Sequence, residues 1–384
     1  MLKKKSIPLS LAMAALAAST GAAAAGPQYT IVDLGALSGD VSQAFSISAN
    51  GANIGGRSFN DTFSTPATWS AAKGTMTALP ELPSRMSARV NGINNAGTAV
   101  GTASVTVSGL NPLPVVWQNG SATQLQLPTG ISTGRATAIS NNGLIVGSAG
   151  GGTNQIAAIY STKGAATVMP KLANGGWMVD AMGVSDTGLV IGTGFDPDNQ
   201  ARNAALVYDT TTGITTDLGA VAGKNGAIPF AITGSGNYIA GVSSQNQGSG
   251  VPFIWSAATG MQAIPLLDGT GYGQATGVNS SGWAVGSDGG LYSNPFLWAD
   301  GTLYSVASLV TDASWDFSYN TASSAYSISD NGTIVGTAYH NGVAHAYEMV
   351  LTSAVPEPGS WALMAAGLAA VAGVARRRSR SSSC

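Results

Sequence analysis

The chain alternates short apolar runs with clusters of Gly, Asn, Ser and Thr. One set of four such runs covers residues 136–139, 144–146, 156–160 and 166–169. The runs are rich in Val, Ile, Thr and aromatic residues and are bounded by turn residues, a pattern typical of β-strands. An amphipathic helix would need about ten or more periodic residues. The pattern therefore predicts an all-β chain of short strands.

A five-residue motif that starts with Ile or Val and ends with Gly recurs seven times. The copies are Ile47–Gly51, Ile93–Gly97, Ile139–Gly143, Val184–Gly188, Ile232–Gly236, Val278–Gly282 and Ile328–Gly332. Such a period indicates repeats that cannot bury their apolar faces alone and stack on their neighbours. Four strands in each ~46-residue repeat predict a seven-bladed β-propeller over residues 26–354. An open β-solenoid is the alternative.

The first predicted strand is expected to close the ring. Tyr29–Gly35 resembles the fourth-strand end Thr215–Gly219, whereas the last repeat runs out after its third strand at residues 344–350. The N-terminal strand would complete the last blade and leave no open edge. Aromatic residues end the third run of each repeat, and we expect them to pack between blades. They are Trp69, Trp117, Tyr160, Tyr208, Trp255, Trp298 and Tyr347.

Glycines punctuate the repeats at two further kinds of position. The Asn-Gly steps at 50–51, 142–143 and 331–332 predict tight hairpins in which both central residues have positive φ. A second glycine, such as Gly101 or Gly147, interrupts the second strand of most repeats. A glycine inside a strand indicates a bulge or a close backbone approach, here expected between neighbouring blades.

The two ends of the chain differ from the repeats. Residues 1–25 contain Lys3–Lys5, an apolar stretch and Ala23–Ala25, which predicts a cleaved secretory signal peptide of the Sec type. Residues 355–384 contain Pro356, Glu357 and Pro358, then an apolar segment at 361–375. An arginine cluster follows: Arg376, Arg377 and Arg378. The apolar segment predicts a short transmembrane helix, which is shorter than the ~20 residues of a permanent span. The arginines would keep the C-terminal end of this helix on the cytoplasmic side.

The order Pro-Glu-Pro, apolar segment and arginine cluster resembles the PEP-CTERM sorting signal of exopolysaccharide-producing Gram-negative bacteria. The resemblance implies that an exosortase, a membrane protease, removes the tail and that the protein is secreted or attached at the cell surface. A plain C-terminal membrane anchor is the alternative. The stretches Pro252–Trp255, Pro295–Trp298 and His345–Tyr347 resemble the HAF family of extracellular repeats, whose function is largely unknown.

Charge and cysteine usage limit the partners. Seven of the 16 basic residues belong to the two ends, so the repeats are acidic overall, with no Lys or Arg between Lys224 and Arg376. Such a surface disfavours nucleic acid and anionic lipid; neutral sugars, divalent cations or cationic polymers fit better. The membrane would be contacted only through the C-terminal segment. Cys384, the single cysteine, lies in the tail, so the repeats are expected to fold without a disulfide.

Few residues offer catalytic or metal chemistry. Gly130–Gly134 matches a Gly-x-Ser-x-Gly nucleophile motif but falls in a loop, outside the strand-to-helix turn that the motif requires. Asp196 and Asp198 place carboxylates at alternate positions, as Ca²⁺ prefers. The run lacks the glycine turn and the closing Glu of a full calcium loop, so a solvated acidic turn is the favoured interpretation. His345 is expected to be structural or half-exposed rather than a metal ligand. We therefore expect a non-enzymatic protein without a cofactor other than Ca²⁺.

Aromatic and acidic residues gather in the loops that join each fourth strand to the next repeat. Aromatic rings stack on C–H-rich sugar faces, so these loops are the candidate ligand surface, which also carries Arg89 and Arg135. Alternatively, Trp315 and Phe317 fill the seam beside the ring closure. The candidate ligand residues are Trp177, Tyr272, Trp315, Asp316 and Tyr319.

These features predict an exported protein that binds or organises extracellular polysaccharide or matrix. One alternative is a glycoside hydrolase or lyase that uses loop carboxylates from distant repeats. Another is a purely structural repeat scaffold.

Overall fold

The computed structural model describes residues 26–37, 41–70, 74–198, 203–245, 250–269, 271–289, 294–318 and 323–353. Tyr29–Leu351 form one compact unit, which does not include the two ends of the chain. The predicted signal peptide and the predicted sorting segment lie outside the described residues. Within the described ranges, no helix is long and apolar enough to cross a membrane.

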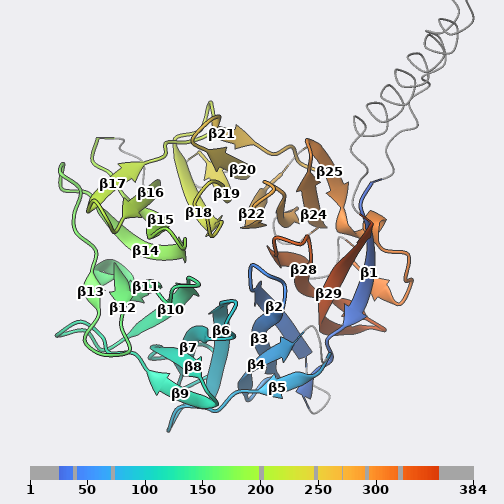
Figure 1. The fold of residues 1–384 in the computed structure, drawn as a ribbon, viewed down its shortest axis with the longest axis horizontal. Helices are drawn as coiled ribbons and strands as arrows, with labels where there is room; N and C mark the ends of the chain where they lie inside the picture. Colours follow the sequence, from blue (N-terminus) through green and yellow to red (C-terminus); the bar gives the residue numbers. More distant parts are fainter. Residues whose placement is uncertain are drawn as a thin grey trace, which may run out of the picture. The chain divides into compact units, whose positions relative to one another are not determined.

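Short antiparallel strands make up the Tyr29–Leu351 unit and are arranged around a central axis (Figure 1). The strands nearest the axis are β2 (Val41–Ile47), β6 (Ser87–Ile93), β10 (Gly134–Ile139), β14 (Trp177–Val184), β18 (Gly226–Ile232), β22 (Gly273–Val278) and β27 (Ser324–Ile328). The second strands are β3 (Asn53–Phe59), β7 (Ala99–Ser104), β11 (Ile145–Ala149), β15 (Leu189–Phe195), β19 (Ile239–Ser244), β23 (Ala284–Asp288) and β28 (Ile334–His340). The third strands are β4 (Ser64–Ser70), β8 (Leu113–Gln118), β12 (Ile156–Tyr160), β16 (Ala204–Asp209), β20 (Gly250–Ser256), β24 (Asn294–Ala299) and β29 (Val343–Ser353). The outermost strands are β5 (Met76–Ala78), β9 (Ser121–Gln124), β13 (Thr167–Val168), β17 (Ile214–Asp217), β21 (Gly260–Ala263), β25 (Thr302–Ser305) and β1 (Gln28–Asp33). The remaining elements are β26 (Trp315–Asp316) and the 3₁₀ helices η2 (Gly152–Asn154) and η3 (Val306–Leu309).

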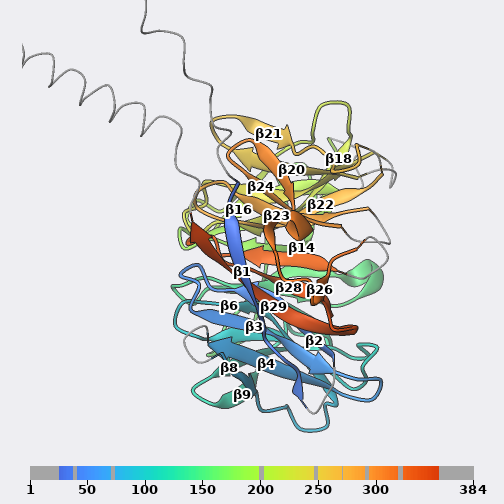
Figure 2. The same ribbon diagram turned by 90° about the vertical axis from the view of Figure 1, so that its right-hand side faces the viewer.

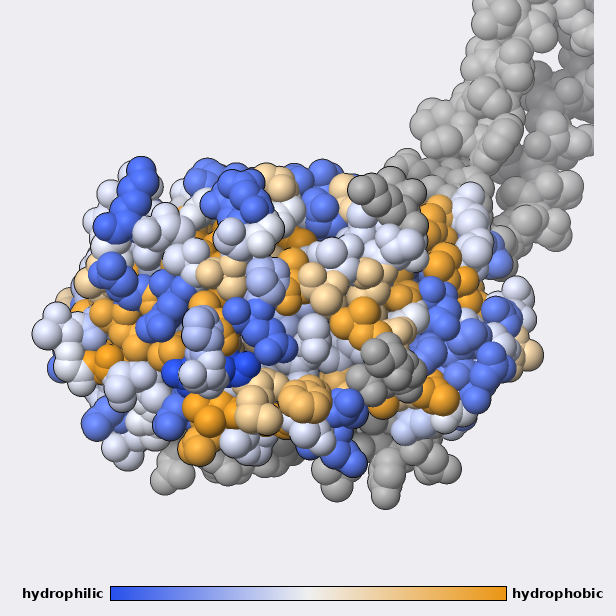
Figure 3. Space-filling model, turned by 90° about the horizontal axis from the view of Figure 1, so that it is seen from below, coloured by the Kyte–Doolittle hydropathy of each residue, from blue (hydrophilic) through white to orange (hydrophobic). Residues whose placement is uncertain are grey.

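Hydrogen bonding groups the described strands into six sheets. Four of them are four-stranded meanders: β10–β13, β14–β17, β18–β21 and β22–β25. Strands β2–β9 form one eight-stranded sheet, and β1 joins β26–β29 in a five-stranded sheet. Sheets that radiate from one axis are the arrangement of a β-propeller, and the expected all-β class is confirmed. Figure 3 shows one side of this body, on which hydrophobic and hydrophilic residues are interspersed.

The first strand closes the ring, as the sequence predicts. β1 is the hydrogen-bonded neighbour of β29, and both views show the two strands side by side (Figures 1 and 2). The Tyr29 hydroxyl donates to the carbonyl of Gly332 at 3.1 Å. The N–H of Leu34 donates to the carbonyl of Ala346 at 3.0 Å, and its own carbonyl accepts the indole N–H of Trp69 at 2.8 Å. The N-terminal strand therefore bonds to both the last and the first repeats.

A bulge and a glycine face each other in every repeat. The pairing of β10 with β11 shifts register between Ala136 and Ala138, directly opposite Gly147. A Cβ atom on Gly147 would lie 2.0 Å from the carbonyl oxygen of Arg135. The equivalent distance is 1.9–2.1 Å at Gly56, Gly101, Gly192, Gly241, Gly286 and Gly336. The predicted close approach is confirmed, but the crowding atom belongs to the neighbouring strand of the same sheet rather than to another blade.

The motif turns differ from the predicted hairpin type. Gly51, Gly143 and Gly332 have φ of 76°, 86° and 84°, whereas the asparagines before them do not have positive φ. The prediction that both central residues adopt positive φ is therefore wrong. In these turns the glycine N–H instead donates a hydrogen bond to the carbonyl of the residue three positions earlier, as from Gly51 to Ser48 at 2.8 Å. Both residues have positive φ at Asn119–Gly120, Asp300–Gly301 and Asn341–Gly342.

The motif turns also bond to one another around the axis. The N–H of Asn95 donates to Asn141 Oδ1 at 2.9 Å, and the N–H of Asn141 donates to Asp186 Oδ1 at 2.6 Å. Where the last repeat meets the first, the N–H of Asp330 donates to the carbonyl of Ala49 at 2.8 Å. We call the seven motif turns the turn ring. Its hydrogen bonds link successive repeats, the closing junction included.

Side chains from neighbouring repeats share their cores. One cluster combines Val146 and Ala157 with Met178 and Ala181 of the next sheet. Trp69, Trp117 and Tyr160 are 2–3% exposed, and Tyr208, Trp255 and Trp298 are half-buried against such clusters, as expected.

The last repeat departs from this pattern. In the repeat before it, Trp298 pairs with Ala284, two residues before the second-strand glycine Gly286. In the last repeat the corresponding residue is Ile334, and it pairs with Met349, whereas Tyr347 pairs with the glycine itself, Gly336. Grouping Tyr347 with the other aromatic residues is therefore wrong, because its position matches Phe296, which pairs with Gly286.

Candidate functional site

The predicted ligand residues that the structure describes are spread over three sheets, and only Trp315 and Asp316 share one of them. Trp177 begins β14, and its ring centroid lies 5.4 Å from that of Phe195. Tyr272 precedes β22, and burial raises the pKa of its hydroxyl. Trp315 on β26 is 7% exposed and belongs to the core cluster of the closing sheet. Tyr319 lies outside the described residues. A ligand-binding role for these residues stays a prediction.

Trp315 packs as the seam-filling alternative requires. Its ring stacks on His340 with centroids 4.6 Å apart and an interplanar angle of 20°. Phe317 is 5% exposed and belongs to the same cluster. Trp315 nevertheless lines a hollow of about 330 Å³ with Asp312, Asp316 and Phe317. Two of the predicted ligand residues, Trp315 and Asp316, thus meet at one hollow.

The calcium candidates form a closed hydrogen-bonded turn. The Asn174 amide donates to Asp196 Oδ1 at 2.6 Å and to Asp198 Oδ2 at 2.7 Å. Asp196 Oδ1 also accepts the N–H of Asp198 at 3.0 Å. Ca²⁺ takes six to eight oxygen ligands, and no third acidic, histidine or cysteine side chain in the described part of the chain lies within liganding reach of this pair. Calcium binding by Asp196 and Asp198 stays a prediction.

Three arginines from successive repeats line one hollow, which we call the arginine pocket. Arg57 lies on β3, Arg89 on β6 and Arg135 on β10. The hollow has a volume of about 240 Å³ and is otherwise lined largely by small and hydroxyl residues, including Ser64, Ser87, Thr102 and Ser104. Phe45 lies beside it, with its ring centroid 5.7 Å from the guanidinium carbons of both Arg57 and Arg89. The pocket therefore combines positive charge, hydroxyl groups and an aromatic ring.

The positive charges of this pocket are only partly compensated. Arg135 pairs with Asp180 and donates to Ser148 Oγ at 3.1 Å. Arg57 donates twice to the neutral Gln43 side chain, at 3.0 and 2.7 Å. Among the described residues, Arg89 contacts no carboxylate and makes no side-chain hydrogen bond, and its side chain stays accessible to solvent.

The pKa values of two of the arginines reflect this crowding. Burial, with Arg89 nearby, lowers the pKa of Arg57 to about 10. Partial burial, with Arg135 nearby, also lowers the pKa of Arg89. Like charges held together without a counter-charge favour an incoming anion.

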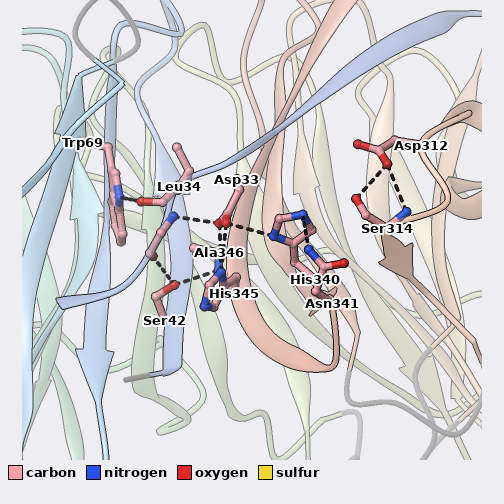
Figure 4. Close-up of polar contacts among 11 residues, drawn as sticks. Asp33, Leu34, Ser42, Trp69, Asp312, Ser314, His340, Asn341, His345 and Ala346 are labelled. Carbon is pink, nitrogen blue, oxygen red and sulfur yellow. Dashed lines mark hydrogen bonds and ion pairs between the residues drawn. The ribbon is translucent and has the colours of Figure 1, made fainter. Parts of the chain in front are cut away.

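A second polar cluster lies where the ring closes, and we call it the closing clasp: Asp33, His340 and His345 (Figure 4). Asp33 ends β1, His340 ends β28, and His345 lies on β29. His340 Nδ1 lies 2.9 Å from Asp33 Oδ2, and His345 Nδ1 lies 3.0 Å from both carboxylate oxygens. Burial raises the pKa of Asp33, but the bonds from the Gly35 N–H and both histidines outweigh it, so the pKa is lowered.

Sequence reasoning predicted neither cluster as a whole. Arg89 and Arg135 were expected on the loop surface, but Arg57 was not, since it lies within a second strand. His345 was expected to be structural or half-exposed, because the sequence has no Cys/His cluster with zinc spacing. Its partner Asp33 lies 312 residues away in the chain. The predicted ring closure could have indicated this contact, since it places the first strand, with Asp33, beside the third strand of the last repeat, with His345.

The family model of the PEP-CTERM protein-sorting motif matches residues 354–379. The predicted sorting signal is confirmed, although its residues lie outside the described part of the chain. A sorting signal of this kind is recognised by an exosortase and indicates an exported, surface-associated protein of a Gram-negative bacterium. The resemblance of the repeats to the HAF family stays a prediction.

No curated protein matches the chain. Several solved structures resemble the chain at low sequence identity and with TM-scores below 0.5. TolB from Acinetobacter baumannii is 11% identical with a TM-score of 0.44, over 79% of this chain and 64% of TolB. The chain thus spans less than two thirds of TolB. The structure titled "YCF48 bound to D1 peptide" is 11% identical with a TM-score of 0.49, over 85% of this chain and 99% of that one. A chain of the mitotic checkpoint complex is 14% identical with a TM-score of 0.45, over 91% and 99% of the two chains.

Proposed function

We propose that this exported protein is a non-enzymatic, seven-bladed β-propeller that binds an acidic extracellular polysaccharide at the bacterial surface. The arginine pocket is the observation that carries the proposal. The sorting signal gives the location, and the predicted N-terminal signal peptide, residues 1–25, would supply the export route.

The way the eight-stranded sheet is joined supports the proposed seven blades. Its two halves, β2–β5 and β6–β9, are each an antiparallel meander, and a single parallel pair, Ser64 with Ser87, connects them. Counting the halves separately and assigning β1 to the last repeat gives one blade for each sequence motif. An experimental structure of the full chain tests this count.

The chemistry of the pocket favours a carboxylated sugar over the neutral sugars that the overall charge suggests. A guanidinium offers a planar fork that matches a carboxylate with two parallel hydrogen bonds. Arg89 is accessible and has no competing carboxylate among the described residues, so its fork is available to such a ligand. The Phe45 ring and the serine and threonine hydroxyls would contact the sugar itself.

The test compares binding of polygalacturonate and of neutral dextran to the full chain at physiological salt. Arg89→Gln removes one charge from the pocket, and Lys163→Gln removes one from the exposed loop between β12 and β13 as a matched control. We expect Arg89→Gln to weaken polygalacturonate binding about 10- to 100-fold, the worth of a charge-assisted hydrogen bond, and Lys163→Gln to leave it unchanged. Equal affinity in both variants would overturn the pocket assignment.

The two alternatives give different results in the same experiment. A glycoside hydrolase or lyase would release new sugar ends from the polymer, and Asp316→Asn would abolish that release. A purely structural scaffold would bind neither polymer while folded. Either result would replace the proposed function.

A further inference from the structure

We propose that the closing clasp binds one divalent transition-metal ion, of the Zn²⁺ class, through Asp33, His340 and His345. This inference is independent of the arginine pocket. The chain contains two histidines in total, and the Nδ1 atoms of both lie within hydrogen-bond distance of the Asp33 carboxylate. Two imidazoles and one carboxylate form a ligand set that suits Zn²⁺ and related ions.

The donor atoms already lie close to liganding positions. One nitrogen of each histidine and one oxygen of Asp33 all lie within 4.8 Å of one another. The nitrogen-to-oxygen distances are 2.9 and 3.0 Å. Metal bonds of 2.0–2.1 Å in a tetrahedron separate neighbouring ligand atoms by about 3.3 Å. Small side-chain movements would therefore admit an ion between the three donors.

Neighbouring groups hold the donors in place. The N–H of Gly35 donates to Asp33 Oδ1 at 2.8 Å, which fixes the carboxylate. Trp315 stacks on the ring of His340. The Asn341 amide lies 3.2 Å from His340 Nε2. With a metal ion on Nδ1, His340 would carry its proton on Nε2, and a flipped Asn341 amide would accept it.

The clasp is open to solvent on one side. The side chains of Asp33, His340 and His345 are 28%, 23% and 20% exposed. An ion can therefore enter, and three protein ligands leave a fourth position for water or an external ligand. The ligands come from the first strand of the ring, β1, and from its last two strands, β28 and β29, so a bound ion would join these strands directly.

The test uses the full chain without a polyhistidine tag, treated with chelator and then titrated with Zn²⁺, Co²⁺ or Ca²⁺ in a calorimeter. We expect one Zn²⁺ or Co²⁺ per chain, visible absorption from bound Co²⁺, and no heat from Ca²⁺ at this site. Asp33→Asn and His345→Gln should each weaken binding at least 30-fold. Asp300→Asn, which changes an exposed turn of another sheet, should leave it unaltered.

A measurement on the unmodified chain covers the case in which these variants fail to fold. Diethyl pyrocarbonate modifies accessible imidazoles, and mass spectrometry reads each of the two histidines separately. Saturating Zn²⁺ should protect both. Unchanged modification, absence of Zn²⁺ and Co²⁺ binding, or equal binding by Asp33→Asn and His345→Gln would each overturn the proposal.

Discussion

Replacing Gly147 by alanine tests the most regular feature of the repeats. The new Cβ would lie 2.0 Å from the carbonyl oxygen of Arg135 and 3.0 Å from the Cα of Ala136. Both atoms belong to the backbone of β10, so no side-chain rotation relieves the contact. Carbon and oxygen atoms approach to about 3.3 Å at best. Strands β10 and β11 must therefore separate by more than about 1 Å.

The energetic cost follows from this separation. Overpacking in a core costs about 1–3 kcal/mol, and each ladder hydrogen bond that breaks costs a further 0.5–1.5 kcal/mol or so. With two such bonds lost, we expect Gly147→Ala to lower the free energy of unfolding by about 2–6 kcal/mol. Urea unfolding of the full chain, followed by tryptophan fluorescence, measures the change.

Gly164 provides the matched control in the same repeat. It lies in the loop between β12 and β13, where an added Cβ meets no atom within 4 Å and φ is not in the left-handed range. Gly164→Ala should stay within about 0.5 kcal/mol of the unmodified chain. If Gly147→Ala behaves the same way, the bulge does not require glycine and the reasoning is refuted.

Two further predictions concern the turn ring and the last strand. Asp186→Ala removes the acceptor of two hydrogen bonds from Asn141, at 2.6 and 2.9 Å, and should lower the free energy of unfolding by about 1.5–3 kcal/mol. Asp61→Ala, in an exposed loop, is the control. Equal stability of the two variants would contradict the role of these hydrogen bonds. Burial raises the pKa of Glu348 above its ordinary 4.5, so its charged form destabilises the fold once the pH exceeds the folded pKa. Glu348→Gln should therefore raise the melting temperature at neutral pH, and the gain should shrink below about pH 4.5, where both folded and unfolded states are protonated; a gain independent of pH would show that charge is not the cause.

Much of the fold was predictable because its signals are local and repeated. The spacing of the Gly-terminated motifs predicted the repeating sheets, and the missing fourth strand of the last repeat predicted the pairing of β1 with β29. The second-strand glycines marked the bulges. The hairpin type was mispredicted because Asn50-Gly51 alone does not show that Ser48 closes a longer turn.

The functional clusters were harder to predict because they join distant residues. Asp33 and His345 meet only through ring closure, and nothing near either residue indicates the other. The arginine pocket brings together side chains that lie one repeat apart in the sequence. The repeats are acidic overall, so their net charge does not indicate a cluster of positive charges. In the last repeat, spacing to the nearest aromatic residue selected Tyr347, while the strand register gives that position to Met349.

The pairing of β1 with β29 also sets an order of events during export. If export starts at the N-terminus, as the predicted signal peptide would require, β1 emerges first, yet the partners of this strand lie more than 300 residues later. The first strand must wait beside incomplete blades until the last repeat emerges. The residues that complete the ring, up to Ser353, directly precede the sorting motif that begins at 354. Completion of the fold and presentation of the tail to the sorting protease therefore coincide, so a chain truncated before its last repeat would lose both.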